Sequence, residues 1–161
     1  MIAAYRRART ARHEGEQGFT LVEVMVVVLI IGILLAIGIP TFLGARSRAQ
    51  DRAAQSNLRV AQNTSLILFT DDGTFAPADN TGLAAAEPQI DWVAGTVDST
   101  DEKLVSVGPN VAGTEFGAAS LSDSGTCYFV RVRANGSTLY GSSTTTSCNA
   151  TNALAVNGTS W

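Results

Sequence analysis

A long apolar run near the N-terminus constrains the fold of this 161-residue chain more than any other feature. Residues 24–39 are uncharged and, apart from glycine, wholly apolar, and Glu23 is the only charged residue between residues 19 and 43. With its flanks the run reaches about 20 residues, which is enough to cross a bilayer core of about 30 Å. Because lipid offers the backbone no hydrogen-bond partners, a single spanning segment must be helical. The sequence therefore predicts a membrane-spanning helix over residues 19–43.

A polar segment, residues 1–18, precedes the run and carries four arginines, Arg6, Arg7, Arg9 and Arg12. It indicates a basic leader on the cytoplasmic side. An ordinary secretory signal is the alternative, but it would have an apolar stretch of about 7–15 residues followed by an A-x-A-like site. Here the run is longer, opens with a carboxylate and is followed by no such site. Arginines on both sides nearly balance the positive-inside count, so charge alone does not orient the segment.

The chain is predicted to stay helical beyond the membrane run, from residue 19 to residue 70. Residues 44–70 lack proline and are rich in alanine, arginine, glutamine and leucine, which favour helix. A narrow apolar stripe recurs there at steps of three or four residues: Ala54, Leu58, Ala61, Ser65 and Leu68. Pro40 is an expected kink, and Gly73 suits a left-handed cap that ends the helix.

The remainder of the chain is predicted to be a connecting loop, residues 71–100, and a small antiparallel sheet, residues 101–161. The clearest strand pattern is the alternation over residues 128–133, where Asn135-Gly136 then suits a two-residue type I′ turn. Weaker strands are predicted over residues 103–107 and 153–156. The turn places Val132 opposite Leu139, so that one apolar face packs on the stripe of the helix: Tyr128, Val130, Val132 and Leu139. The predicted fold class is α+β.

Composition excludes several classes of function. The single histidine, His13, lies in the leader, so the rest of the chain has no imidazole for Ser-His-Asp catalysis, Cys-His catalysis or His-ligated zinc. The net charge is −3, and no broad basic face supports DNA binding. Acidic clusters at residues 71–72 and 98–102 match no calcium loop, so we interpret them as solvated turns. No catalytic residue, metal site or cofactor is predicted.

The two cysteines, Cys127 and Cys148, both lie in the last quarter of the chain without C-x-x-C spacing. A disulfide between them would stabilise the fold by roughly 3 kcal/mol, whereas the alternative is a pair of free cysteines in the core. Disulfides persist outside the cytosol. The pair therefore favours an external position for this end of the chain.

The most specific motif lies at the junction of leader and run. Gly18-Phe19-Thr20-Leu21-Val22-Glu23, leading directly into the apolar run, resembles the processing site of type IV pilins and related prepilin-type proteins. In that family a membrane aspartyl protease cuts after the glycine and methylates the new amino terminus. The resemblance implies a leader removed after Gly18, an N-methylated Phe19, and a processing site that includes Thr20 and Leu21. It also implies a pilin-like fold with assembly roles for Glu23 and for Pro40, which falls where many pilins carry a proline.

A weaker resemblance concerns the C-terminal part. The sequence Ser-Gly-Thr-Cys-Tyr at residues 124–128, with Tyr140-Gly141 and Cys148, is similar to the cysteine-bounded hairpin of some Gram-positive pilin-like proteins. A small external sheet has a core too thin to hold its loops alone. We therefore predict a Cys127–Cys148 bridge.

Glu23 has a chemical partner if the leader is removed. A carboxylate in a spanning helix is costly to insert, so it is expected to have a function. Cleavage would create an amine on Phe19 that is largely protonated at neutral pH and one helical turn away. Glu23 could pair with its own amine or with that of a neighbouring subunit. The alternative is an unpaired Glu23 that reaches the membrane interface.

The resemblance implies a structural subunit of a type IV pilus, with a role in adhesion, motility or DNA uptake. Expected partners are identical subunits, the prepilin peptidase/methyltransferase, a pilus assembly platform and, before assembly, the cytoplasmic membrane. The filament itself would be extracellular. One alternative is a pseudopilin of a type II secretion or competence apparatus. A distant alternative is a membrane-anchored binding module that never polymerises, which would need neither Glu23 nor the Gly18-Phe19 junction; an enzyme is not expected.

Overall fold

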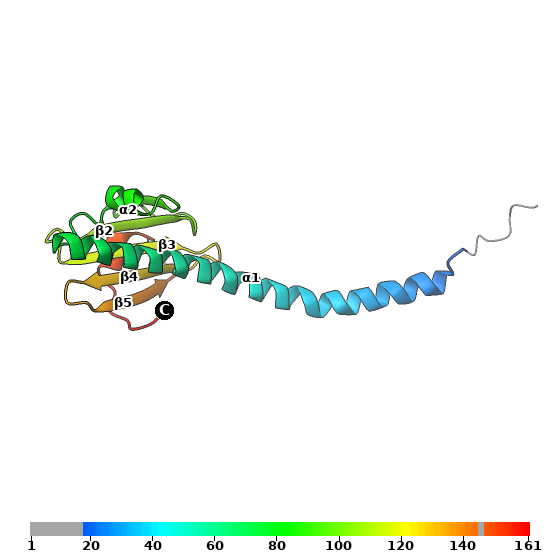
Figure 1. Cartoon of the computed structure of the whole chain (residues 1–161). Helices are drawn as coiled ribbons and strands as arrows, with labels where there is room; N and C mark the ends of the chain where they lie inside the picture. Colours follow the sequence, from blue (N-terminus) through cyan, green and yellow to red (C-terminus); the bar gives the residue numbers. More distant parts are fainter. Residues whose placement is uncertain (1–17, 145–146) are drawn as a thin grey trace, which may run out of the picture. The chain divides into compact units, whose positions relative to one another are not determined.

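The computed structural model describes residues 18–144 and 147–161, which form two compact units divided after Phe42 (Figure 1). Helix α1, Leu21–Asp72, contributes residues to both units. The single long helix predicted from the sequence is confirmed, with each end displaced by two residues. Gly73 ends it as predicted: its φ is +68° and its N–H donates to the carbonyl of Phe69 at 2.8 Å.

The first unit contains the apolar part of α1. Every described residue from 18 to 42 is exposed. α1 includes a stretch that is long and apolar enough to cross a membrane, and none of that stretch is buried. An apolar surface of this extent requires lipid or protein to cover it.

The second unit, Leu43–Trp161, contains a sheet with the strand order β1-β2-β3-β4-β5. The strands are β1 (Asp91–Ala94), β2 (Leu104–Pro109), β3 (Glu115–Leu121), β4 (Cys127–Arg133) and β5 (Thr138–Ser143). β1 pairs with β2 in parallel, and the other neighbours are antiparallel. The segment expected to be a connecting loop, residues 71–100, contains β1 and the short helix α2 (Asn80–Ala86).

The amphipathic part of α1 packs on one face of this sheet (Figure 1). Three of its stripe residues, Ala54, Leu58 and Ala61, are completely buried together with side chains of the strands. Ser65 is also buried, while Leu68 is partly buried at the margin. The partners are small or branched apolar residues and aromatic rings, among them Val105, Val107, Phe116, Val130 and Val132. Periodicity in the sequence therefore identified the packed face of the helix correctly.

The β4–β5 hairpin differs from the prediction by one residue in register. Val132 lies opposite Thr138, and Leu139 lies opposite Arg131 rather than Val132. A type I′ turn requires a positive φ at both Asn135 and Gly136. Among the described residues only glycines have a positive φ, so Gly136, at +82°, meets this requirement and Asn135 does not. The Asn135 side chain instead accepts hydrogen bonds from the N–H and hydroxyl of Ser137. This longer loop puts Tyr140, not Leu139, on the face that meets α1.

The opposite face of the sheet carries a smaller core. Ala119, Cys127 and Phe129 pack there against Cys148 and Ala153. The predicted strand over residues 153–156 is wrong: the chain forms the short helix α3 (Ala150–Ala153), because the Asn149 side chain accepts from the N–H of Asn152 and caps it. The tail joins the sheet edge through the Tyr140–Gly158 bridge, and the indole N–H of Trp161 donates to the carbonyl of Phe129 at 2.9 Å.

The disulfide joins Cys127 of β4 to Cys148, with their Cα atoms 5.6 Å apart. Both cysteines are almost fully buried. We expect thiol labelling of denatured, unreduced protein to modify neither residue, and labelling after reduction to modify both. Replacing both by alanine is expected to lower the free energy of unfolding by about 2–4 kcal/mol, measured by urea titration. Labelling of both thiols without a reductant would contradict the bridge.

Candidate processing and assembly site

The predicted processing residues lie together at the exposed start of α1. Gly18, Phe19 and Thr20 precede the first helical residue, Leu21, and Phe19 is 83% exposed. The carbonyl of Thr20 accepts hydrogen bonds from the N–H groups of Glu23, at 3.1 Å, and Val24, at 3.3 Å. The junction is therefore a short extended segment joined to a helix, accessible on all sides.

Thr20 and Glu23 form a capping arrangement that the sequence analysis missed. The hydroxyl oxygen of Thr20 accepts a hydrogen bond from the N–H of Glu23 at 3.2 Å, and the same hydroxyl lies 3.5 Å from a carboxylate oxygen of Glu23. The spacing Thr-x-x-Glu before an apolar run is the sequence signal for such a cap. A carboxylate in the first turn is also favoured by the helix dipole. Glu23 thus contributes to capping of α1, and an experiment on its role in assembly must distinguish the two roles.

Gly18 has no structural reason to be glycine. A Cβ added to it would meet nothing within 4 Å, and its backbone is outside the left-handed region. Any requirement for glycine at this position must therefore come from another molecule that binds the junction.

Pro40 lies within α1 and is not brought near Glu23. The two residues are separated by about 25 Å along the helix axis. The helix continues through Pro40, and the hydroxyl of Thr41 donates to the carbonyl of Ile37 at 3.0 Å. Between Glu23 and Pro40 the exposed residues are all apolar, and four of them, Val24, Met25, Val28 and Leu29, line a shallow apolar groove.

A hydroxyl-rich cluster in the second unit ties α1 to the β3–β4 turn. One carboxylate oxygen of Asp51 accepts hydrogen bonds from the hydroxyls of Ser122, at 2.8 Å, and Ser124. Burial raises the pKa of the nearby Tyr128 phenol, and the Asp51 carboxylate raises it further. Both serines donate to a carboxylate and none of the described residues is a histidine, so the cluster holds the turn against the helix and resembles no nucleophilic site.

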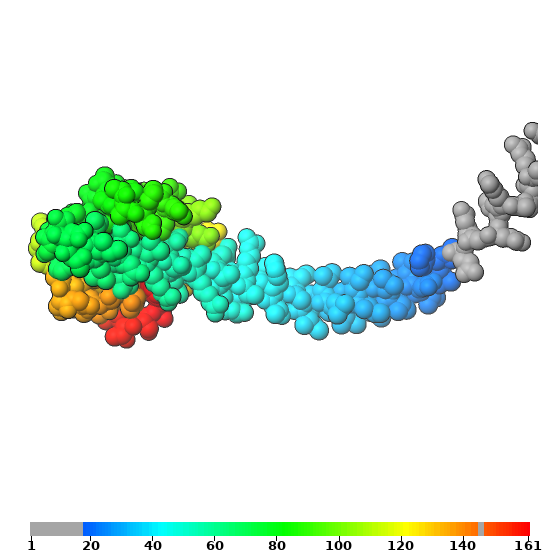
Figure 2. Space-filling model, viewed as in Figure 1, coloured from blue at the N-terminus to red at the C-terminus, as the bar shows by residue number. Residues whose placement is uncertain are grey.

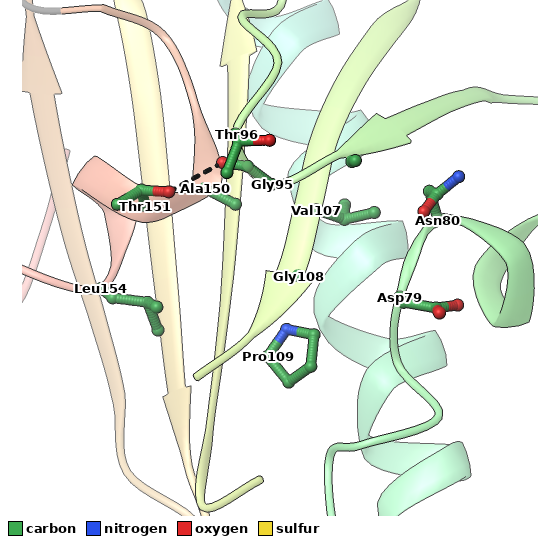
Figure 3. Close-up of a pocket in the computed structure, with 11 residues that line it drawn as sticks. Asp79, Asn80, Gly95, Thr96, Val107, Gly108, Pro109, Ala150, Thr151 and Leu154 are labelled. Carbon is green, nitrogen blue, oxygen red and sulfur yellow. Dashed lines mark hydrogen bonds between the residues drawn. The ribbon is translucent and has the colours of Figure 1, made fainter. Parts of the chain in front are cut away.

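A cavity of about 250 Å³ lies between α2, the ends of β1 and β2, and α3 (Figure 3). Its only ionisable residue is Asp79, which caps α2. The hydroxyl of Thr81 and the N–H of Gly82 donate to Asp79 and lower the pKa of its carboxyl group. The Thr151 hydroxyl donates to the carbonyl of Gly95. The Asp79 carboxylate and the Thr151 hydroxyl are therefore used within the fold. Within residues 18–144 and 147–161, no three His, Cys, Asp or Glu side chains are grouped to hold a metal ion.

Comparison with known proteins agrees with this geometry. A family model described as "Prokaryotic N-terminal methylation motif" matches residues 15–39. Over 68 residues the chain is 37% identical to the type II secretion system core protein G of Escherichia coli. This alignment covers 42% of this chain and 46% of that protein. Over 64 residues the chain is 38% identical to the type IV major pilin protein PilA of Myxococcus xanthus, which covers 40% of this chain and 29% of that protein. Over part of its length the chain is therefore similar to both pilin and pseudopilin sequences.

Further relatives are of the secretion type. The core protein G of Vibrio cholerae is 39% identical over 70 residues, covering 44% of this chain and 47% of that protein. The chain thus spans about half the length or less of these relatives. No solved structure matches it significantly. Relatives of both kinds match, so the comparison does not choose between pilus and pseudopilus.

Proposed function

We propose that this protein is a structural subunit of a type IV pilus that is cut after Gly18, N-methylated at Phe19 and polymerised into a surface filament. One observation carries the proposal: a methylation motif opens a helix whose residues up to Phe42 are all exposed, with Glu23 as the only charged residue among them. Lipid alone could cover this part of the helix, and Glu23 could cap the helix of a plain anchor, but a plain anchor has no use for the methylation motif. A filament uses both the motif and the charge.

Assembly would cover the apolar surface with identical helices once it leaves the lipid. A contact between two different faces of the same subunit is heterologous and open-ended, so it builds a filament. The partners we propose are identical subunits, the prepilin peptidase/methyltransferase, a pilus assembly platform and, before assembly, the cytoplasmic membrane. Adhesion, motility or DNA uptake would be the role of the finished filament.

A pseudopilin of a type II secretion or competence apparatus is the second candidate. The similarity to several core protein G sequences favours it. The disulfide in the second unit is compatible with both candidates, because the bacterial periplasm and the cell exterior both keep such a bond oxidised.

Shearing separates the two candidates. Fibres sheared from cells that express this protein are expected to contain it, and electron microscopy is expected to show filaments absent from a deletion strain. Mass spectrometry of the fibres should find a first peptide that begins with N-methylated Phe19. Fibre-free supernatants, together with a deletion strain that fails to secrete proteins, would assign the chain to a secretion pseudopilus instead.

A further inference from the structure

We infer that the second unit has two oppositely charged faces through which one copy of this chain docks on the next. One face is a row of three arginines on α1: Arg48, Arg52 and Arg59, called here the arginine row. The other is a hollow lined by four carboxylates: Asp91, Asp101, Glu102 and Asp123, called here the acidic hollow. This inference rests on the proposed function and names the faces that polymerisation would use.

The arginine row is exposed and lacks a counter-ion among the described residues. Steps of four and seven residues return to nearly the same side of a helix, so Arg48, Arg52 and Arg59 share one flank of α1. All three are exposed, and none forms an ion pair with any described residue. The guanidinium of Arg59 lies 5.6 Å from the ring centre of Trp161, which in turn contacts Tyr140 of β5. The row therefore lies on the β5 side of α1.

The acidic hollow lies on the other flank. It has a volume of about 310 Å³, and its only cation, Lys103, makes no ion pair within the described residues. One carboxylate oxygen of Glu102 is buried there without a hydrogen-bond donor. The side chain of Asn57 donates to the carbonyl of Glu102 at 2.6 Å, and Gln50 reaches Asp123 at 3.5 Å. These contacts fix the hollow beside α1, on the side of β1 and β2.

The two faces point in opposite directions from one subunit. Asn57 and Arg59 are two residues apart, which on a helix is a turn of about 200°. The strand order likewise places β1 and β5 at opposite edges of the sheet. Figure 2 shows α2 on one side of α1 and β5 with the C-terminal segment on the other. Opposite charges on opposite flanks allow the arginine row of one copy to meet the acidic hollow of the next. Such a contact is heterologous, so it can be repeated along a filament.

The occupant is a second copy, because the charges match each other. DNA is a poor match for the arginine row, because the chain has a negative net charge and the row offers only three cations to the phosphates. A neighbouring hollow supplies four carboxylates and a single lysine. Exposed pairs of this kind guide register and association more than they add affinity, so they should matter most during assembly and weaken with salt.

Charge reversal tests the contact in a strain that expresses only the variant. Arg48→Glu with Arg52→Glu leaves Arg59 on Trp161, and Asp91→Lys with Asp123→Lys leaves the hydrogen bonds of Asp101 intact. We expect each pair of substitutions to reduce sheared fibres by about tenfold while processed subunit remains in the membrane. Combining all four should restore fibres to within about threefold of wild type. Normal fibres from either pair, or no recovery in the combination, would overturn the inference; so would intact fibres with impaired DNA uptake.

Cross-linking tests the contact without depending on surface fibres. Wild-type cysteines are already bridged, so Arg52→Cys with Asp123→Cys adds two new thiols to the full chain. Oxidation of cells is expected to give a ladder of covalent multimers from the double variant and none from either single variant. A dimer from Arg52→Cys alone would mean a symmetric contact and would reject the arrangement. If wild type makes no fibres but the ladder forms, the surface-pilus proposal fails and the docking faces stand.

Discussion

Gly18→Asp is expected to leave the leader attached, so that an unprocessed precursor accumulates in the membrane and almost no mature chain forms. The resemblance to prepilins places the cut after this glycine. Because a side chain at Gly18 meets nothing within the subunit, the substitution should not disturb α1. The added carboxylate would be felt only by a peptidase that binds the extended junction ahead of Thr20, where exposed backbone is available to it.

The matched control is Gly15→Asp, the same change within the leader. Its neighbours Glu14 and Glu16 are already acidic, so we expect normal cleavage. Immunoblotting distinguishes precursor from mature chain, and mass spectrometry identifies the first residue. A Gly18→Asp chain that begins with Phe19 in sheared fibres would show that cleavage at this bond does not require glycine.

Local patterns in the sequence predicted α1 well because helix formation and burial both follow the spacing of residues along one segment. The stripe at Ala54, Leu58 and Ala61 is the buried face, and Gly73 is the cap. The proposed processing site is likewise a linear motif, and the family model of N-terminal methylation matches residues 15–39. The cap by Thr20 was also available as Thr-x-x-Glu and was overlooked because Glu23 had been considered only as a charge in lipid.

Long-range pairing was less predictable. Asn135-Gly136 is compatible with more than one hairpin loop, and the side-chain bonds of Asn135 to Ser137 selected the longer one. β3 was missed because the small residues between Phe116 and Leu121 show no alternation. The acidic hollow combines residues from β1, the segment before β2 and the β3–β4 turn, so only the folded chain brings them together.

Glu23→Leu is expected to give a stable, processed, membrane-resident subunit and few or no fibres. Removing the charge should ease insertion, by at most roughly 2.5–3.5 kcal/mol and by less near the interface. A simple anchor would therefore tolerate the change or improve. An assembling subunit would lose the counter-ion for a partly desolvated Phe19 amine, and breaking such a buried pair can cost about 3–5 kcal/mol. Cleavage depends chiefly on Gly18 and should survive.

The cap at Thr20 demands a second variant. Glu23→Leu removes the charge and also the side-chain contact with the Thr20 hydroxyl, while the backbone N–H of residue 23 can still donate to Thr20. Glu23→Gln removes the charge but keeps a side chain that is found at this position of the capping box. If pairing with the Phe19 amine drives assembly, the glutamine variant should lose fibres as the leucine variant does. If capping of α1 is what matters, glutamine should restore them.

Fibre counts by electron microscopy, with membrane and sheared fractions compared by immunoblot, distinguish these outcomes. Normal counts for Glu23→Leu would defeat both explanations of the role of Glu23, while the filament itself would stand. Fibres from Glu23→Gln but not Glu23→Leu would transfer the role of Glu23 from its charge to the helix start. Loss of both variants from the membrane would show that Glu23 acts before assembly, in insertion or stability. This result would be opposite to the easier insertion expected when a charge is removed from a spanning helix.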